Sequence, residues 1–309
     1  MAKTGADAIV ALPCSVSFAM NEAGCGRWLA RSMASRQPVD CSALQRVLAE
    51  LSLPAPETGL AGLRYWGQTG APPSGWLAGA DPVWLQAGLD KLYLHAPAAD
   101  DLDAETLSEL MADLQEAMFA DDQSDFEALG NFGYLHSPQE FATSSLPADA
   151  ISGTRPDPYL PSGASATRYL QLCGEIQLAL HDHRSNLQRE QRGQPPVNSL
   201  WLWGGGTVDG HVPRTLPALF ANEPLMRGYW WYSQASVSDW PGSLSQCATV
   251  SEGRFVAVVP PPVADVSVDA VATALRELQA LQANGRLPDI ALLFMDGTVL
   301  RVRRSEIGR

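Results

Sequence analysis

The order of helical and extended patterns along this 309-residue chain predicts a mixed fold, either α/β or α+β. Residues 7–12 are typical of a short buried strand, and residues 255–259 of a strand that is buried on both faces. Helices with an apolar stripe alternate with such strands. Between residues 80 and 140, a hairpin, a helix and a strand pair follow one another, which predicts a small inserted α+β unit.

The individual elements follow from apolar spacing, cap residues and turn residues. Helices are expected over 44–51 after a Ser42 cap, over 104–119 after Asp103, over 165–183 and over 267–284. Strands are expected as hairpins over 83–95 and 290–302, as a pair over 126–135 and singly over 197–203. The pair Asp296-Gly297 is a type I′ turn signal. Residues 54–80 and 142–166, rich in Pro and Gly, predict irregular connections, and a polar segment follows at 182–196.

Composition excludes several classes of protein. The chain has 34 acidic and 21 basic side chains, a net charge of −13, which argues against a nucleic-acid or anionic-lipid partner. Mean hydropathy is −0.08 and no apolar run approaches the length of a membrane span. The five cysteines form no CxxC motif, and the N-terminus lacks a complete secretory signal, so we expect free thiols in the cytoplasm.

The polar segment between residues 181 and 198 is the strongest candidate for a binding site. It concentrates histidine, arginine and asparagine, and guanidinium forks and amides suit recognition of phosphate or carboxylate. The ligand candidates here are Asn186, Arg189 and Asn198. The competing interpretation is a helix end, where basic groups complement the helix dipole, followed by a polar loop.

Two further segments are weaker candidates. Three glycines, 204–206, follow a predicted strand as phosphate loops do, so Gly205 is a ligand candidate, although no Walker or dinucleotide spacing surrounds it. The aromatic cluster 226–232 contains Arg227, which can anchor an anion beside an apolar pocket. Packing within the core remains the alternative for this cluster.

Neither a metal site nor an activated nucleophile is evident. His181, Asp182 and His183 are possible metal ligands, but no third ligand follows from the spacing. GxSxG, SxxK and a Cys–His dyad are all missing. We therefore expect no metal and no cofactor.

A longer block of residues resembles a known family. Asn186-x-x-Arg189-Glu190-x-x-Gly193-x-Pro195-Pro196, continuing to Gly204-Gly205-Gly206, is similar to the hallmark of RpfE-type regulatory proteins. These are related to archaeal-type cofactor-independent phosphoglycerate mutases. Ala80-Asp81-Pro82-Val83-Trp84-Leu85-Gln86-Ala87 and Pro161-Ser162-Gly163 match as well, so the resemblance covers about residues 76–230.

The resemblance implies an alkaline-phosphatase-like α/β fold: a mixed sheet flanked by helices, with a core domain over 1–75 and 142–309 and an inserted unit over 76–141. It places Asn186, Arg189 and Asn198 near a phosphosugar-acid site. Such mutases need two metals, held by Asp and His, and a phosphoryl-carrying Ser. Here the first strand ends in Pro13-Cys14 instead of Asp-Gly, and no histidine follows His211.

The expected function is therefore that of a catalytically degenerate, mutase-like regulatory protein, and mutase activity is not expected. Its partner would be a small phosphorylated or carboxylated metabolite, or a protein. The alternative is a metal-dependent phosphotransferase or phosphoglycerate mutase with unusual ligands, drawn from His181, Asp182, His183, Asp209 and His211.

Overall fold

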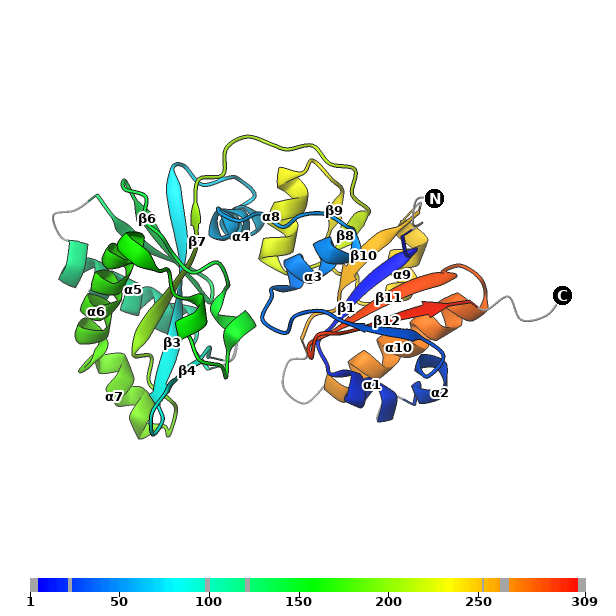
Figure 1. Cartoon of the computed structure of the whole chain (residues 1–309), viewed down its shortest axis with the longest axis horizontal. Coiled ribbons are helices and arrows are strands. Elements are labelled where there is room, and N and C mark those ends of the chain that lie inside the picture. The colour runs from blue at the N-terminus through cyan, green and yellow to red at the C-terminus, as the bar shows by residue number, and fades with distance from the viewer. Residues whose placement is uncertain are drawn as a thin grey trace. The chain divides into compact units, whose positions relative to one another are not determined.

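The computed structural model describes residues 5–21, 24–97, 101–119, 123–251, 253–261 and 267–304. Contacts divide the chain into two compact units (Figure 1): unit 1 is Met1–Ala55 with Gly210–Arg309, and unit 2 is Pro56–Asp209. The predicted class, a mixed α/β fold with a mixed sheet flanked by helices, is confirmed. Within the described residues, no helix combines the length and apolar character needed to span a membrane.

Unit 1 is built on a seven-stranded mixed sheet whose central strands run parallel. Val10 in the middle strand pairs with Ala257 on one side and Leu292 on the other. In sheet order the strands are β2 (Met33–Arg36), β12 (Thr298–Arg303), β11 (Asp289–Phe294), β1 (Ala8–Leu12), β10 (Phe255–Val258), β8 (Ala218–Phe220) and β9 (Val237–Ser238). The first two strands in this order pair antiparallel.

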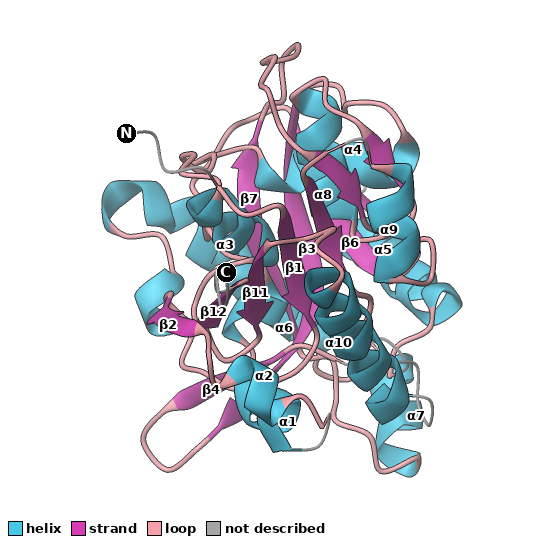
Figure 2. Cartoon of the chain, turned by 90° about the vertical axis from the view of Figure 1, so that its right-hand side faces the viewer, coloured by secondary structure: helices cyan, strands magenta, loops and turns pink. Residues whose placement is uncertain are grey.

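Helices cover both faces of this sheet (Figure 2). On one face, Ala8, Val10 and Leu12 share a core with residues of α1 (Val16–Asn21), α2 (Gly26–Leu29), α9 (Leu244–Val250) and α10 (Ser267–Ala283). On the other face, α3 (Ala43–Glu50) contacts β1, β11 and α8 (Pro224–Tyr232). Burial on both faces explains why β1 and β10 are continuous apolar runs without alternation.

Unit 2 is arranged around one long strand, β3 (Trp76–Ala87), which pairs antiparallel with three others. Its partners are β4 (Leu92–His95), β6 (Phe132–Ser137) and β7 (Ser199–Gly206), and β5 (Asp125–Leu129) lies at the edge beyond β6. The helices are α4 (Leu60–Thr69), α5 (Ala104–Phe119), α6 (Ala166–Leu180) and α7 (Arg184–Gln191), with short 3-10 turns at Ala148–Ile151, Asp157–Tyr159 and Gly163–Ser165.

The two faces of the unit 2 sheet pack differently. On one face, Ala80, Leu135 and Leu202 share an apolar core with residues of α5 and α6. On the other face, Leu77 and Tyr134 pack with Ala61 of α4 in a much smaller cluster. Polar contacts therefore carry much of the attachment of α4.

An ion pair joins α4 to the sheet. Arg64 Nη1 lies 2.8 Å from Asp81 Oδ1, and the two side chains are 4 % and 12 % exposed. The guanidinium also donates from Nε to Tyr134 Oη at 3.0 Å and from Nη2 to Gly133 O at 3.0 Å. Trp203 Nε1 donates to Asp81 Oδ2 at 2.6 Å. Burial acts to lower the pKa of Arg64, but Asp81 and Tyr134 outweigh it and raise the pKa, so the guanidinium stays charged.

Several predicted elements are confirmed with their caps. The Ser42 hydroxyl accepts from Gln45 N at the start of α3, and the Gln45 side chain accepts from Ser42 N, which completes a capping box. Asp103 Oδ1 accepts from Thr106 N before α5. The hairpin β3–β4, the pair β5–β6, strand β10 and helix α10 lie where the sequence predicts them.

Two helices lie in segments that the sequence predicts as an irregular connection and a polar segment. The segment 54–80 contains α4 and the beginning of β3 instead of an irregular connection. Gly59 and Gly70 flank α4 with φ of 72° and 81°, so the glycines that suggested a loop are the ends of a helix. The polar segment 182–196 contains α7, which buries Ser185, Asn186 and Arg189 and therefore shows no apolar stripe.

The turn at Asp296-Gly297 differs in type from the prediction. A type I′ turn needs positive φ at both central residues, and of these two only Gly297 has it, at 78°. Gly297 N donates to Phe294 O at 3.1 Å, and Asp296 Oδ1 accepts from Thr298 N. The carboxylate of Asp296 therefore organises the turn in place of a second positive φ.

The compact unit that the contacts define extends beyond residues 76–141, the range that the sequence predicts for the inserted unit. Strand β7 pairs with β3 along its length, and α4 packs on both strands. The compact unit therefore extends from residue 56 to residue 209 and interrupts unit 1 once. The expected domain limits, 1–75 with 142–309 and 76–141, differ from these units because the sequence does not reveal which strand is the partner of β3.

Replacing Arg64 with methionine should destabilise unit 2. The change leaves the buried Asp81 carboxylate with the Trp203 indole but without its cation, which typically costs about 3–5 kcal/mol. Urea denaturation followed by tryptophan fluorescence measures the loss, and hydrogen exchange assigns it to unit 2.

The matched control is Arg155→Met, because Arg155 and Asp157 form a pair whose side chains are 51 % and 60 % exposed. That change should cost less than about 1 kcal/mol. Equal effects of the two substitutions would show that the buried pair does not hold α4.

Candidate functional site

Asn186 and Arg189 are occupied by the backbone of unit 2. Asn186 Nδ2 donates to Leu180 O at 2.9 Å and to Val197 O at 2.8 Å, while its Oδ1 accepts from Val197 N at 2.8 Å. Arg189 Nε donates to Pro195 O at 2.7 Å, and the side chain is buried. Both side chains therefore fasten α7 and the loop after it to the start of β7.

Asn198 and Gly205 lie near opposite ends of β7. The Asn198 amide donates to Leu85 O at 3.0 Å and accepts from Leu85 N at 2.7 Å, which extends the pairing of β7 with β3. Gly205 N donates to Thr143 Oγ1 at 2.9 Å, and the Trp76 ring lies where a side chain at this position would point. Seven residues of strand place the two positions about 23 Å apart.

The structure thus brings together only part of the predicted ligand set. Asn186, Arg189 and Asn198 gather at the start of β7, where their polar atoms bond to main chain. Gly205 lies at the far end of the strand, and Arg227 lies in unit 1. That these five residues bind a ligand remains a prediction, and the structure assigns the first three a fold-stabilising role as well.

His183 caps a helix. Its Nδ1 accepts from Ser185 N at 3.3 Å at the start of α7, so the proton of the neutral ring lies on Nε2. Nε2 lies 3.0 Å from Asp113 Oδ2 on α5. His183 therefore ties α7 to α5, and a metal ion bound at either ring nitrogen would displace one of these contacts.

The alternative metal ligands do not assemble. The side chains of His181 and Asp182 are 80 % and 94 % exposed in unit 2, whereas His211 belongs to unit 1 with its Nδ1 3.2 Å from Trp231 O. Across the described ranges, no three His, Cys, Asp or Glu side chains form a group able to hold a metal ion. The described donor set does not fit the two metals that the resemblance implies.

The second place to seek a site is the carboxyl edge of the unit 1 sheet, where ligands of parallel sheets usually bind. Polar side chains follow four strands there. We use the name carboxyl edge for these residues: Cys14 and Ser15 after β1, Asn222 and Glu223 after β8, Asp239 after β9 and Asp296 after β11. The sequence signal for this edge is an acidic residue one to three positions after a strand, as at Glu223, Asp239 and Asp296.

Two carboxylates of the carboxyl edge bind the chain's own N–H groups. Asp296 Oδ2 accepts from Val16 N at 2.9 Å, at the start of α1. Glu223 accepts from Leu225 N at 3.1 Å and Met226 N at 2.7 Å, at the start of α8. Partial burial acts to raise the pKa of Asp296, but the backbone donors outweigh it and hold the pKa below its usual value. An internal carboxylate thus occupies each of these helix N-termini, positions suited to anions.

Cys14 lies two residues after the central strand β1, a position that suits a metal ligand or a nucleophile. Burial, and then the negative charge of Asp296, raise the pKa of its thiol to about 11. The neighbouring Ser15 hydroxyl accepts from Phe18 N and caps α1. Neither side chain has the features of an activated nucleophile, because a reactive cysteine needs a lowered pKa.

Arg227 is the one predicted ligand residue with a described hydrogen bond to the carboxyl edge, through Asp239. Its Nη1 donates to Ala221 O at 3.0 Å and to Asp239 Oδ1 at 2.5 Å. The guanidinium carbon lies 5.1 Å from the centroid of the Trp231 ring. The Arg227 side chain is 19 % exposed, whereas that of Asp239 is 81 % exposed. A carbonyl and a ring therefore position the guanidinium, and its third partner is a carboxylate largely in solvent.

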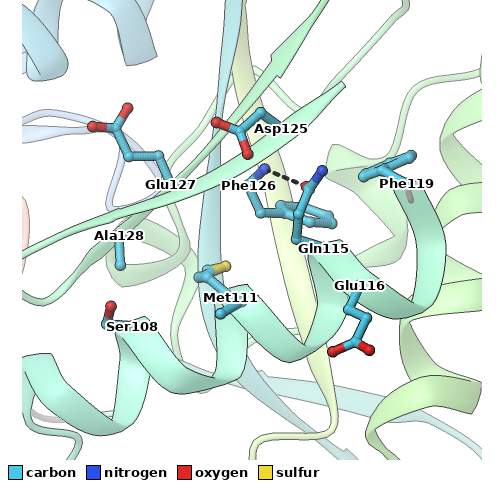
Figure 3. Close-up of a pocket in the computed structure, with 10 residues that line it drawn as sticks. Ser108, Met111, Gln115, Glu116, Phe119, Asp125, Phe126, Glu127 and Ala128 are labelled. Atoms are coloured by element: carbon cyan, nitrogen blue, oxygen red, sulfur yellow. Dashed lines mark hydrogen bonds between the residues drawn. The ribbon is translucent and has the colours of Figure 1, made fainter. Parts of the chain in front are cut away.

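A pocket of about 610 Å³ lies elsewhere, between α5 and β5 of unit 2 (Figure 3). Met111, Phe119 and Phe126 line it together with the carboxylates of Glu116, Asp125 and others. Negative charge disfavours an anionic ligand here. The pocket therefore does not fit the metabolite class that the sequence predicts.

Gln115 lies in the wall of this pocket and binds the outer edge of β5. Its Oε1 accepts from Phe126 N at 2.9 Å, the bond drawn in Figure 3, and its Nε2 donates to Ser124 O at 3.0 Å. One side-chain amide thus satisfies a donor of the edge strand β5 and an acceptor of the residue before it.

No family model matches the chain. Two curated relatives illustrate its similarity to known proteins. The chain is 30 % identical over 126 residues to a 2,3-bisphosphoglycerate-independent phosphoglycerate mutase of Methanosarcina acetivorans, covering 38 % of this chain and 31 % of that protein. It is 32 % identical over 102 residues to a probable enzyme of the same name from Geobacter sulfurreducens, and this match covers 32 % of this chain and 25 % of that protein. The matched region thus spans less than a third of the relatives' own length.

Two solved structures align over nearly the whole chain. The PH0037 protein from Pyrococcus horikoshii aligns with a TM-score of 0.50 at 10 % identity, over 97 % of this chain and 88 % of that one. A cofactor-independent phosphoglycerate mutase from Thermoplasma acidophilum aligns with a TM-score of 0.44 at 16 % identity, over 98 % of this chain and 91 % of that one. In sequence, the chain is homologous to cofactor-independent phosphoglycerate mutases over about a third of its length.

Proposed function

We propose that this chain is a mutase-like regulatory protein that binds a small phosphorylated or carboxylated metabolite without turning it over. One observation carries the proposal: at the carboxyl edge, carboxylates available for metal binding hold the protein's own N–H and guanidinium groups. Homology to phosphoglycerate mutases supports the ligand class. The RpfE-type designation and a cytoplasmic location remain predictions from the sequence.

Arg227 is the residue that we propose to hold the anion. Asp239 is its only largely exposed partner among the contacts described, and a phosphate or carboxylate of the ligand can take the place of that carboxylate. Ala221 O and the Trp231 ring would keep the guanidinium in position during the exchange. Asp239 would then act as an internal competitor that the ligand displaces.

Arg227→Ala should weaken binding of 3-phosphoglycerate roughly 10- to 100-fold, the equivalent of a lost charge-assisted hydrogen bond. Asp239→Asn should strengthen binding about 1.5- to 5-fold, because it removes an exposed competing pair. Isothermal titration calorimetry with 3-phosphoglycerate, and with inorganic phosphate as a second probe, measures both changes without added metal.

Asp157→Asn is the matched control, since Asp157 also pairs with an arginine but lies in unit 2. The Asp157→Asn variant should bind 3-phosphoglycerate and inorganic phosphate with the same affinity as the parent. If Arg227→Ala binds as well as the parent, the anion does not bind at Arg227. If neither probe binds the parent, the proposed ligand class is wrong and a protein partner becomes the better candidate.

The second candidate, a metal-dependent mutase, is favoured by the homology alone. Conversion of 3-phosphoglycerate to 2-phosphoglycerate in the presence of Mn²⁺ or Mg²⁺ distinguishes the two. We expect no turnover above the uncatalysed rate. Turnover that requires metal and is abolished by His183→Ala and His211→Ala would replace the binding proposal by the enzymatic one.

Cys14 should react slowly with iodoacetamide at neutral pH. Because its pKa is raised to about 11, the thiolate is scarce below that pH, and the alkylation rate should rise about tenfold per pH unit between pH 8 and 10. Mass spectrometry of the Cys14 peptide measures the rate, with Cys14→Ser identifying the site. A rate that is already constant above pH 7 would reveal an activated thiolate and contradict an inert carboxyl edge.

A further inference from the structure

Three polar side chains meet at the C-terminal end of α8, and we call them the Arg214 cluster. Tyr229 and Ser233, four residues apart, lie on one face of the helix and are 1 % and 0 % exposed. Arg214 is half-buried beside them, since its backbone N–H donates to Ser233 O at 3.0 Å. Arg214 Nε, Tyr229 Oη and Ser233 Oγ are all buried, and none of them has a hydrogen-bond partner among the described residues.

The groups of the Arg214 cluster lie close enough to influence one another. Burial raises the pKa of Tyr229, while the Arg214 charge and the Ser233 hydroxyl act to lower it. A hydrogen bond between the two hydroxyls would use only one O–H group. The other O–H and the Arg214 Nε–H would still lack an acceptor, so the cluster has donors in excess.

The negative charge that Arg214 needs does not come from the described residues. Within that part of the chain, Arg214 takes part in no ion pair. Arg227 differs in this respect, because it pairs with Asp239. A partly buried cation without a counter-charge is costly, so a native fold that keeps one calls for an acceptor from outside the chain.

The usual role of an arginine at a helix C-terminus is already filled here. Basic side chains in this position donate to the last carbonyls of the helix. The carbonyls of residues 229–233 accept instead from the backbone N–H groups of Ser233, Ala235, Gln234, Val212 and Arg214, in that order. These bonds leave the guanidinium free for another acceptor, and they reduce the negative potential that a helix end presents to an anion.

We propose that the Arg214 cluster is a second anion site, which takes a small tetrahedral oxyanion of the phosphate type. The oxygens of such an anion can accept from a guanidinium and two hydroxyls at once. Entry is from the side of segment 211–215, where every residue except Arg214 is exposed. Tyr229 lies about 160° from Arg227 around the axis of α8, so this site is separate from the one at Arg227 and does not depend on it.

Isothermal titration calorimetry with inorganic phosphate tests the site in the full chain. The titrations use Arg227→Ala as the reference protein, so that the anion site of the proposed function does not contribute. The reference should bind phosphate, and adding Arg214→Met should weaken this binding at least tenfold, because it removes a charge-assisted donor. Adding Arg155→Met, a change at an exposed arginine of unit 2, should leave the affinity unchanged.

The two anion proposals fail in different ways in this experiment. Phosphate binding that is absent from the Arg227→Ala reference, or that Arg214→Met leaves unchanged, overturns the second site. The first of these outcomes leaves the proposed function at Arg227 intact if the unsubstituted chain binds phosphate.

Tyr229→Phe separates a ligand site from a hydrogen bond within the fold. The change keeps the ring and removes only the phenolic O–H. In buffer without oxyanions, the urea midpoint of unfolding should stay the same or rise, because a buried hydroxyl without a partner costs stability. The phosphate affinity should fall about 2- to 10-fold. A midpoint that falls in oxyanion-free buffer shows that the phenol already has a partner within the fold and overturns the proposal.

Thermal unfolding in sodium sulfate provides a second probe of the ligand class. Sulfate stabilises folded proteins in general, so the difference between the parent and Arg214→Met is the quantity that matters. Sulfate should raise the Tm of the parent more than that of Arg214→Met, and sodium chloride of equal ionic strength should not. Equal rises in sulfate for the two proteins contradict an oxyanion site at Arg214.

Discussion

The buried ion pair between Arg64 and Asp81 is the contact on which the arrangement of unit 2 depends. It replaces apolar packing on the sheet face that α4 covers, where the apolar cluster is small. All three guanidinium nitrogens donate a hydrogen bond, which compensates for the burial of the charge. A buried pair adds little net stability over an apolar pair, but it permits few alternative positions. It therefore specifies where α4 sits relative to β3, β6 and β7.

The sequence predicts elements well where local chemistry and packing agree. The Ser42 capping box, the Asp103 cap and the amphipathic α5 are examples, because cap and apolar stripe point to the same helix. Prediction fails where tertiary contacts reverse the local signal. Helix α4 begins and ends at left-handed glycines, and α7 turns polar side chains inward. Neither pattern differs locally from that of a loop.

The same reversal explains why the candidate site was only partly predictable. Arginine and asparagine in a polar segment have the donors that an anion requires, but backbone carbonyls require the same donors. Asn186 and Arg189 bind such carbonyls, and only the fold reveals this. Arg227 stands out in the sequence as an arginine among aromatic residues, and its ligand role remains a proposal. Its partner Asp239, twelve positions later, does not stand out, because pairing across β8 and β9 brings the two together.

The amide of Gln115 has a consequence for how readily the chain pairs with other molecules. Edge strands present unpaired N–H and C=O groups that recruit strands from other molecules and seed aggregates. Gln115 occupies the carbonyl of Ser124, just before β5, and the N–H of Phe126 within it. An incoming strand would have to displace this side chain before it could pair with those two groups, which disfavours growth of the sheet at this edge.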